Sequence, residues 1–217
     1  MQIESKLPDV GETIFSVMTK LANEHQALNL SQGFPVFDTD PALIDLVTAY
    51  MQKWHNQYAP MQGVRALRER IADKTYDMYG GRYDPATEIT VTSGATESVF
   101  AAISAVVQKD DEVIIFEPAY DAYVPIIRLS HGIPVYVQLT PPNYGIDWNQ
   151  VAGHITEKTR LSILNSPHNP TGRTLNQADM HALEALLADT NILILSDEVG
   201  LASIIPIELA DLPDSFL

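Results

Sequence analysis

The sequence predicts an α/β fold in which a mostly parallel sheet carries helices on both faces, preceded by an N-terminal helical arm. From Glu88 onward, short apolar runs rich in β-branched residues alternate with segments of helical periodicity. This alternation is typical of parallel strands buried between helices. The segment before Glu88 carries helical patterns. With 217 residues, of which 46% are hydrophobic, the chain is long enough to bury a sizeable core.

Three helices are expected in the first part of the chain. Residues 13–25 carry four apolar side chains at helical spacing. Residues 40–50 begin with an Asp-Pro pair, which favours a helix start because aspartate caps the first turn and proline fits its first position. Residues 63–79 show helical periodicity and stop at Gly80, where glycine readily adopts the left-handed conformation that ends a helix.

The predicted sheet is built from five short apolar runs. They are residues 89–92, 113–116, 133–137, 161–164 and 192–195. The segments between and after these runs are predicted to be helices that cover the sheet. They are residues 95–108, 121–130, 147–155 and 177–188.

Composition and charge exclude several classes of function. The formal net charge is −15 and the pI is about 4.6, so the surface repels nucleic acid, and no nucleic-acid partner is expected. The chain has no cysteine, and its six histidines show no metal-ligand spacing, so no metal site is expected. The N-terminus lacks the apolar stretch of a signal peptide, and no run of about 18 apolar residues occurs. We therefore expect a cytoplasmic protein with no membrane partner.

Polar side chains gather just after four of the predicted strands. Ligands of open parallel α/β sheets bind beyond the carboxyl ends of the strands, so these positions are candidates for a site. They are Ser-Gly-Ala-Thr at 93–96, Glu-Pro-Ala-Tyr at 117–120, Asn-Ser-Pro-His-Asn-Pro-Thr-Gly at 165–172 and Ser-Asp-Glu at 196–198.

The first two of these motifs each have two interpretations. Residues 93–96 open a helix, so their backbone N–H groups and the Thr96 hydroxyl can hold a phosphate with the help of the helix dipole. The same residues are also consistent with an ordinary helix cap. Tyr120 can lie against a planar ring, although an aromatic side chain after a strand is more often part of the core.

The other two motifs concentrate hydrogen-bonding groups. The loop at 165–172 is dense in side-chain donors, although Asn, Pro and Gly also favour plain turns. Asp197 ends an apolar strand, where burying an unpaired carboxylate is costly, so it is expected to meet a cation or a strong donor, unless it serves as a cap or ion pair. Together the four motifs fit pyridoxal phosphate (PLP), whose ring nitrogen needs a carboxylate to stay protonated. Asp197 is the candidate for that pairing.

On these residues the sequence resembles the class I and II aminotransferases of fold type I, and especially their methionine and kynurenine/glutamine branch. The resemblance also rests on Asn-Leu-Ser-Gln-Gly-Phe-Pro at 29–35 and on Asn-Gln-Tyr-Ala-Pro at 56–60 followed by Gly63. It extends over about residues 5–199. It implies an N-terminal arm with part of a small domain at 1–40, an incomplete PLP-binding large domain at 41–199, and a divergent tail at 200–217.

The resemblance also implies roles for individual residues. Gly94, Ala95 and Thr96 would contact the phosphate. Tyr120 would stack on the ring, Asn169 would bind its phenolic oxygen, and Asp197 would pair with the pyridinium. Tyr58 would reach the phosphate bound by the other subunit of a homodimer. Gly33 and Phe15 would line the amino-acid side of the pocket, although Phe15 is equally well explained as a core aromatic of the first helix.

The sequence departs from the family pattern at its end. After Ser-Asp-Glu-Val the family continues with tyrosine, whereas this chain has Gly200, and the last of its six lysines is Lys158. We therefore expect no catalytic residue within this chain, because the lysine that binds PLP and the arginine that binds the substrate carboxylate are absent. The leading hypothesis is PLP-dependent transfer of an amino group from a methionine-like or aromatic amino acid to a 2-oxo acid.

Two other hypotheses remain. The first is a truncated, non-catalytic remnant with at most weak, non-covalent PLP binding. The second is a nucleotide-binding Rossmann protein, which the absence of a G-x-G-x-x-G turn after the first strand disfavours.

Overall fold

The computed structural model describes residues 4–33, 37–53 and 55–199. The chain divides into two compact units. One consists of residues 8–61, and the other contains residues 4–7 and 62–199. The second unit contains the whole sheet.

The smaller unit contains helices α1 (Ile14–Glu24) and α2 (Pro41–Gln52), as predicted. Thr13 caps α1 by accepting a hydrogen bond from the backbone N–H of Ser16. Asp40 caps α2 in the same way through Ala42, and proline occupies the first turn. Neither helix contains a buried residue within this chain.

Helix α3 (Arg65–Tyr79) confirms the third predicted helix and belongs to the larger unit. It ends at Gly80, which has the left-handed conformation with φ of 74°. The buried guanidinium of Arg68 donates to the carbonyl oxygens of Gly63 and Pro85, so the side chain joins the start of α3 to the segment after it.

Gly63 lies where two segments approach closely. Its φ is +95°, and an added Cβ would lie 2.7 Å from Cβ of Val91. We expect Gly63→Ala to destabilise the fold by about 1–3 kcal/mol, because the added Cβ would clash with the Val91 side chain and the positive φ is unfavourable for alanine. The control is Gly153→Ala in a helix, where nothing lies within 4 Å and alanine favours the helix. Urea unfolding should show a lower free energy of unfolding for Gly63→Ala and a higher one for Gly153→Ala. Equal changes in the two variants would contradict the prediction.

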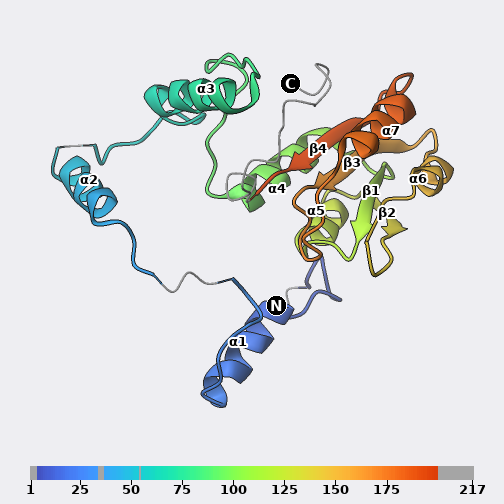
Figure 1. The fold of residues 1–217 in the computed structure, drawn as a ribbon, viewed down its shortest axis with the longest axis horizontal. Coiled ribbons are helices and arrows are strands. Elements are labelled where there is room, and N and C mark those ends of the chain that lie inside the picture. Colours follow the sequence, from blue (N-terminus) through green and yellow to red (C-terminus); the bar gives the residue numbers. More distant parts are fainter. Residues whose placement is uncertain (1–3, 34–36, 54, 200–217) are drawn as a thin grey trace. The chain divides into compact units, whose positions relative to one another are not determined.

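The sheet has four parallel strands in the order β2-β1-β3-β4 (Figure 1). Their bounds are Glu112–Glu117 for β1, Ile133–Gln138 for β2, Thr159–Asn165 for β3 and Leu193–Asp197 for β4. Four of the five predicted strands are thus confirmed, together with the parallel arrangement. The covering helices are α4 (Ala95–Val106), α5 (Tyr123–Leu129), α6 (Trp148–His154) and α7 (Gln177–Leu187), also as predicted.

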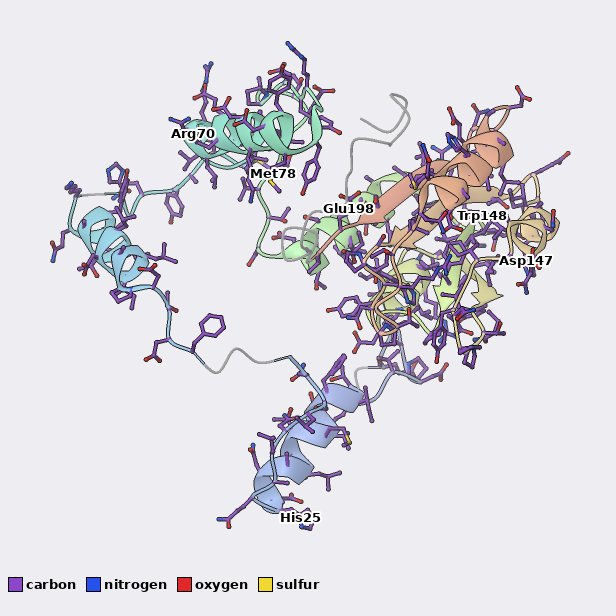
Figure 2. All side chains as sticks on the ribbon, viewed as in Figure 1. His25, Arg70, Met78, Asp147, Trp148 and Glu198 are labelled. Atoms are coloured by element: carbon purple, nitrogen blue, oxygen red, sulfur yellow. The ribbon has the colours of Figure 1, made fainter. Side chains whose placement is uncertain are left out.

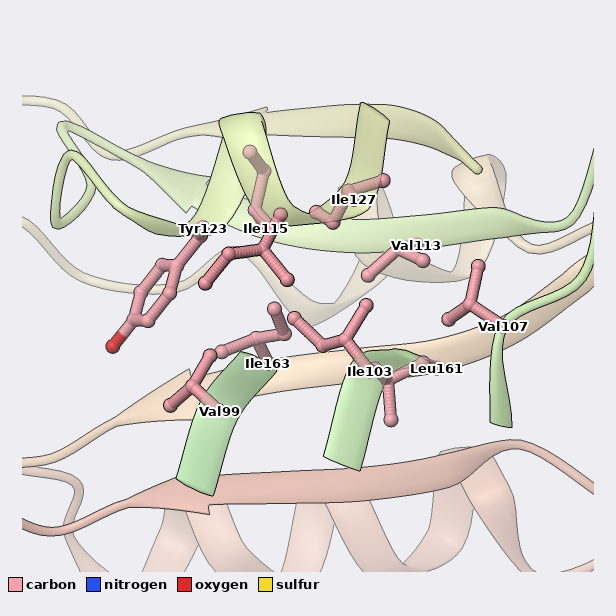
Figure 3. Close-up of a cluster of buried hydrophobic side chains, with 10 residues drawn as sticks. Val99, Ile103, Val107, Val113, Ile115, Tyr123, Ile127, Leu161 and Ile163 are labelled. Atoms are coloured by element: carbon pink, nitrogen blue, oxygen red, sulfur yellow. The ribbon is translucent and has the colours of Figure 1, made fainter. Parts of the chain in front are cut away.

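Each face of the sheet carries its own hydrophobic cluster, because alternate residues of a strand point to opposite faces. Ile115 and Ile163 pack with residues of α4 and α5 on one face (Figure 3). Ile114 and Leu164 pack with residues of α6 and α7 on the other. This arrangement confirms the prediction of helices on both faces.

The predicted strand at residues 89–92 is wrong, because these residues do not form a strand. A strand needs a neighbour to accept its backbone hydrogen bonds. The edges of the described sheet are β2 and β4, and neither pairs with residues 89–92. Instead, the Val91 N–H donates to the carbonyl oxygen of Gln62 at 3.0 Å. Residue types that favour strands therefore do not form a strand here, where no neighbouring strand pairs with them.

Within the described residues, none of the helices combines the length and apolarity needed to cross a membrane.

Candidate functional site

Three of the predicted site residues, Tyr120, Asn169 and Asp197, lie at or just beyond the carboxyl ends of parallel strands. Strands β1, β3 and β4 end at Glu117, Asn165 and Asp197. Asn165 and Asp197 are register partners, so their side chains start from adjacent backbone positions. Glu198, which follows β4, is labelled in Figure 2.

Neighbouring groups donate to both the side chain and the backbone carbonyl of Asp197. The Tyr123 hydroxyl donates to its Oδ2 atom, and the Val199 N–H donates to its Oδ1 atom at 3.2 Å. The side-chain amide of Asn165 donates to the backbone carbonyl of Asp197 at 2.9 Å. The sequence predicted a strong donor for this carboxylate, and the structure provides one in Tyr123.

Asn165 also connects Asp197 to Asn169. Its side-chain oxygen accepts a hydrogen bond from the Asn169 N–H at 2.6 Å. One asparagine at the end of β3 therefore contacts both the end of β4 and the loop that carries Asn169. The Asn169 residue is exposed, so its amide can reach a ligand at this edge of the sheet.

Two tyrosines connect Asp197 to the start of helix α4. The ring centroids of Tyr120 and Tyr123 lie 5.6 Å apart at an interplanar angle of 73°. The Tyr120 hydroxyl lies 3.4 Å from Oγ1 of Thr96. Direct contacts thus connect Thr96, through Tyr120 and Tyr123, to Asp197. This series fits a site for one small molecule.

The start of α4 leaves room beside its first turn. Gly94 is the N-cap residue, its φ is +84°, and no side chain caps the helix there. An added Cβ at Gly94 would meet no atom within 4 Å. Because the first N–H groups of a helix point outward and carry partial positive charge, this open end suits an anion such as a phosphate.

The loop between β3 and α7 is fixed by buried polar contacts. Nδ1 of His168 lies 2.8 Å from Oγ1 of Thr171. Arg173 donates to Oδ2 of Asp179 at 3.0 Å, and Trp148 donates to Oδ1 of Asp179 at 3.1 Å. These contacts fix the ends of the loop that presents Asn169. Trp148 is labelled at the start of α6 in Figure 2.

Burial affects two ionisable side chains near the site. Burial raises the pKa of the Tyr123 phenol, and the hydrogen bond to the Asp197 carboxylate raises this pKa further. Burial lowers the pKa of His168, although a hydrogen bond to the backbone of Phe116 acts in the opposite direction. Tyr123 is therefore a neutral donor over the whole physiological pH range.

Three predicted residues belong to the smaller unit, residues 8–61, and are described within it. Tyr58 is fully exposed there, at 102% relative exposure. Gly33 is also exposed. Phe15 lies on α1 and is partly buried, which is consistent with either of its two interpretations.

Sequence reasoning did not single out Tyr123 or Asn165. Tyr123 is the first residue of α5 and follows Tyr120 by three positions, across a turn in which the Tyr123 N–H donates to the Tyr120 carbonyl oxygen. Two tyrosines so close to the end of β1 could have signalled a pair. Asn165 was noted only as part of its loop motif. Its position as the last residue of β3 is the signal that it lies at the strand-end site.

A model of the family described as aminotransferase class I and II matches residues 25–199. Methionine aminotransferase of Escherichia coli is 50% identical over 196 residues, which are 90% of this chain and 51% of that protein. Human kynurenine–oxoglutarate transaminase 1 is 31% identical over 193 residues, 83% of this chain and 46% of that protein. The chain thus spans about half the length of the curated relatives it matches.

Solved structures give the same result. A crystal structure from Escherichia coli, reported to have a methionine aminotransferase function, has a TM-score of 0.89 and 50% identity. The match covers 92% of this chain and 52% of that one. N-succinyldiaminopimelate aminotransferase from Mycobacterium tuberculosis has a TM-score of 0.86 at 36% identity, covering 91% of this chain and 52% of that one.

Proposed function

The chain belongs to the class I and II aminotransferases, as the motifs predicted, and on that premise we propose that it supplies most of the PLP-binding site of an aminotransferase. Enzymes of this family depend on PLP. The proposed reaction transfers an amino group from a methionine-like or aromatic amino acid to a 2-oxo acid. The methionine and kynurenine enzymes among the relatives support that substrate class.

One observation carries the proposal: a continuous series of contacts joins the helix start at Thr96 to the carboxylate of Asp197. The contacts run through Tyr120 and Tyr123, and Asn165 extends them to the loop of Asn169. A phosphorylated pyridine needs an anion site, an aromatic face, a donor for its phenolic oxygen and a carboxylate within the span of one molecule. These residues fit that requirement.

Each proposed role follows from the chemistry of the side chain. Ala95 and Thr96 offer backbone N–H groups to the phosphate, and Thr96 also offers a hydroxyl. Gly94, whose own N–H donates to the Thr92 carbonyl oxygen, contacts the phosphate as a residue without a side chain that would obstruct it. Tyr120 offers a ring face, and Asn169 an amide donor. Asp197 offers a negative charge that keeps a ring nitrogen protonated. PLP, when bound, acts as an electron sink for the α-carbon of the amino acid.

Other parts of the proposal concern regions beyond this edge of the sheet. We propose a homodimer in which Tyr58 contacts the phosphate of the other subunit, and Gly33 and Phe15 line the substrate pocket. The full exposure of Tyr58 within this chain supports a role toward a ligand or a partner. We also propose the division into an arm with part of a small domain at 1–40, a large domain at 41–199 and a tail at 200–217.

Asp197→Asn tests the proposed function. The change keeps the shape of the side chain and removes its charge, so we expect the affinity for PLP to fall about 10- to 100-fold, the range of one charge-assisted hydrogen bond. Titration of the 217-residue chain with PLP, followed by absorbance, measures this affinity. The control is Asp121→Asn, an equivalent change at an exposed aspartate. Unchanged affinity in Asp197→Asn would contradict the proposal.

A further inference from the structure

Tyr123 lies partly in the core and partly at the site. It is 3% exposed, and its ring packs in the hydrophobic cluster between the sheet, α4 and α5. Figure 3 shows the ring at one end of that cluster, with the hydroxyl pointing away from the aliphatic side chains. The hydroxyl donates to Oδ2 of Asp197, which lies 74 residues further along the chain.

The Asp197 carboxylate is held from two directions. Val199 donates to Oδ1 and Tyr123 donates to Oδ2, so rotation of the carboxylate would break at least one hydrogen bond. The Val199 donor is backbone that directly follows the strand. The Tyr123 donor is rigid for a different reason, since its ring is enclosed by core side chains and has an edge-to-face contact with Tyr120.

We propose that Tyr123 is a positioning residue, whose buried hydroxyl fixes the orientation of the Asp197 carboxylate so that it can pair with a protonated ring nitrogen. The inference deepens the proposed function and rests on it. A carboxylate held next to the ring nitrogen favours the protonated pyridine over the neutral one, because opposite charges attract most strongly at short distance. Tyr123 therefore acts on the cofactor only through Asp197.

The environment of Tyr123 keeps its proton in place. The groups that face the phenol are the Asp197 carboxylate and the Tyr120 phenol, and both raise the pKa of Tyr123, as does burial. A phenol with this raised pKa donates to the carboxylate and does not compete with it for a negative charge. The hydrogen bond consequently persists at any pH at which the enzyme would work.

The first experiment follows the Tyr123 phenol by NMR in the chain without PLP. The nine tyrosines are labelled with ¹³C at Cζ, and the Tyr123 resonance is assigned from its loss in Tyr123→Phe. In Asp197→Asn at neutral pH we expect the Tyr123 resonance to move, because its hydroxyl loses a charged acceptor. An unchanged resonance would overturn the contact on which the inference depends.

The second experiment measures PLP binding by Tyr123→Phe, which keeps the ring in the core. We expect the affinity to fall about tenfold, as for loss of one hydrogen bond to a charged group. With ¹⁵N-labelled PLP, the ring-nitrogen resonance should move toward the unprotonated position. A purely structural role would leave that resonance unchanged. The matched control is Tyr136→Phe on β2, at a 39% exposed position outside the site.

The outcomes separate the two proposals. If the unaltered chain binds PLP and Tyr123→Phe changes neither the affinity nor the ring-nitrogen resonance, the positioning role is wrong and the proposed function stands. If the unaltered chain does not bind PLP, the proposed function fails and the positioning role fails with it, while the Tyr123 resonance in Asp197→Asn still decides whether the contact exists. A shifted resonance in Tyr123→Phe alone, with Tyr136→Phe unchanged, supports both.

Discussion

Replacing Ile115 with alanine is expected to lower the free energy of unfolding by about 2–5 kcal/mol. Ile115 is completely buried at the centre of β1, where it packs between the sheet and the helices on one face (Figure 3). The neighbouring Ile103 of α4 and Ile127 of α5 are also completely buried. Because these side chains are held by two helices and the sheet, they cannot move far enough to fill the cavity, so the cost includes both lost burial and an empty volume.

The matched control for Ile115→Ala is Ile133→Ala at the start of the edge strand β2. Ile133 is 43% exposed, so the same substitution removes much less buried surface, and we expect a cost of about 1 kcal/mol or less. Urea denaturation followed by circular dichroism measures both variants. Equal losses in the two variants would mean that the cluster on this face does not hold the sheet together.

Most of the fold could be predicted because its determinants are local. The period of apolar residues predicted helices α1 to α7, and capping residues such as Asp40 and Gly80 predicted where two of them begin or end. The strand predicted at residues 89–92 failed because strand formation depends on a partner that the local sequence does not reveal. Periodicity thus identifies an amphipathic segment, whereas pairing is a property of the whole sheet.

The part of the candidate site that follows from the order of the parallel strands could be predicted from the sequence. Parallel strands align their carboxyl ends, so Asp197 and the loop of Asn169 could be assigned to one edge from sequence order alone. The donors to Asp197 could not be assigned in this way. The contact between Tyr123 and Asp197 crosses from a helix to a strand 74 residues away, and no periodic pattern encodes such a contact. Only the folded chain brings these two residues into contact.

The ion pair of Arg173 and Asp179 could not be predicted from the sequence pattern either. Breaking it is the second change for which we expect a large loss of stability. Asp179→Asn should lower the free energy of unfolding by about 3 kcal/mol, the lower end for removing one partner of a buried ion pair. The lower end applies because the Arg173 side chain keeps 25% of its exposure, whereas that of Asp179 keeps 9%. Thermal or urea unfolding of the variant measures the loss.

The geometry explains why even an isosteric amide is costly at position 179. Oδ2 of Asp179 accepts hydrogen bonds from Arg173 and from the Asn176 N–H, while Oδ1 accepts one from Trp148. An asparagine side chain has only one oxygen, so its NH₂ group must face at least one of these donors. Among the described residues, the Nε atom of Arg173 is already buried without a hydrogen-bond partner. Apart from Asp179, the guanidinium donates only to the carbonyl oxygen of Asn143, at 3.4 Å, within the described part of the chain.

The same substitution should also weaken the proposed ligand site. Arg173 and Asp179 fix the end of the loop that presents Asn169, so a loosened loop should reduce the affinity for PLP as well as the stability. Glu69→Gln is the control, because it removes a carboxylate from an exposed pair with Arg65 on α3, where little change is expected. A fully stable Asp179→Asn variant would contradict this account of the loop. A destabilised variant with normal PLP affinity would show that the pair of Arg173 and Asp179 does not hold Asn169 in its proposed binding position.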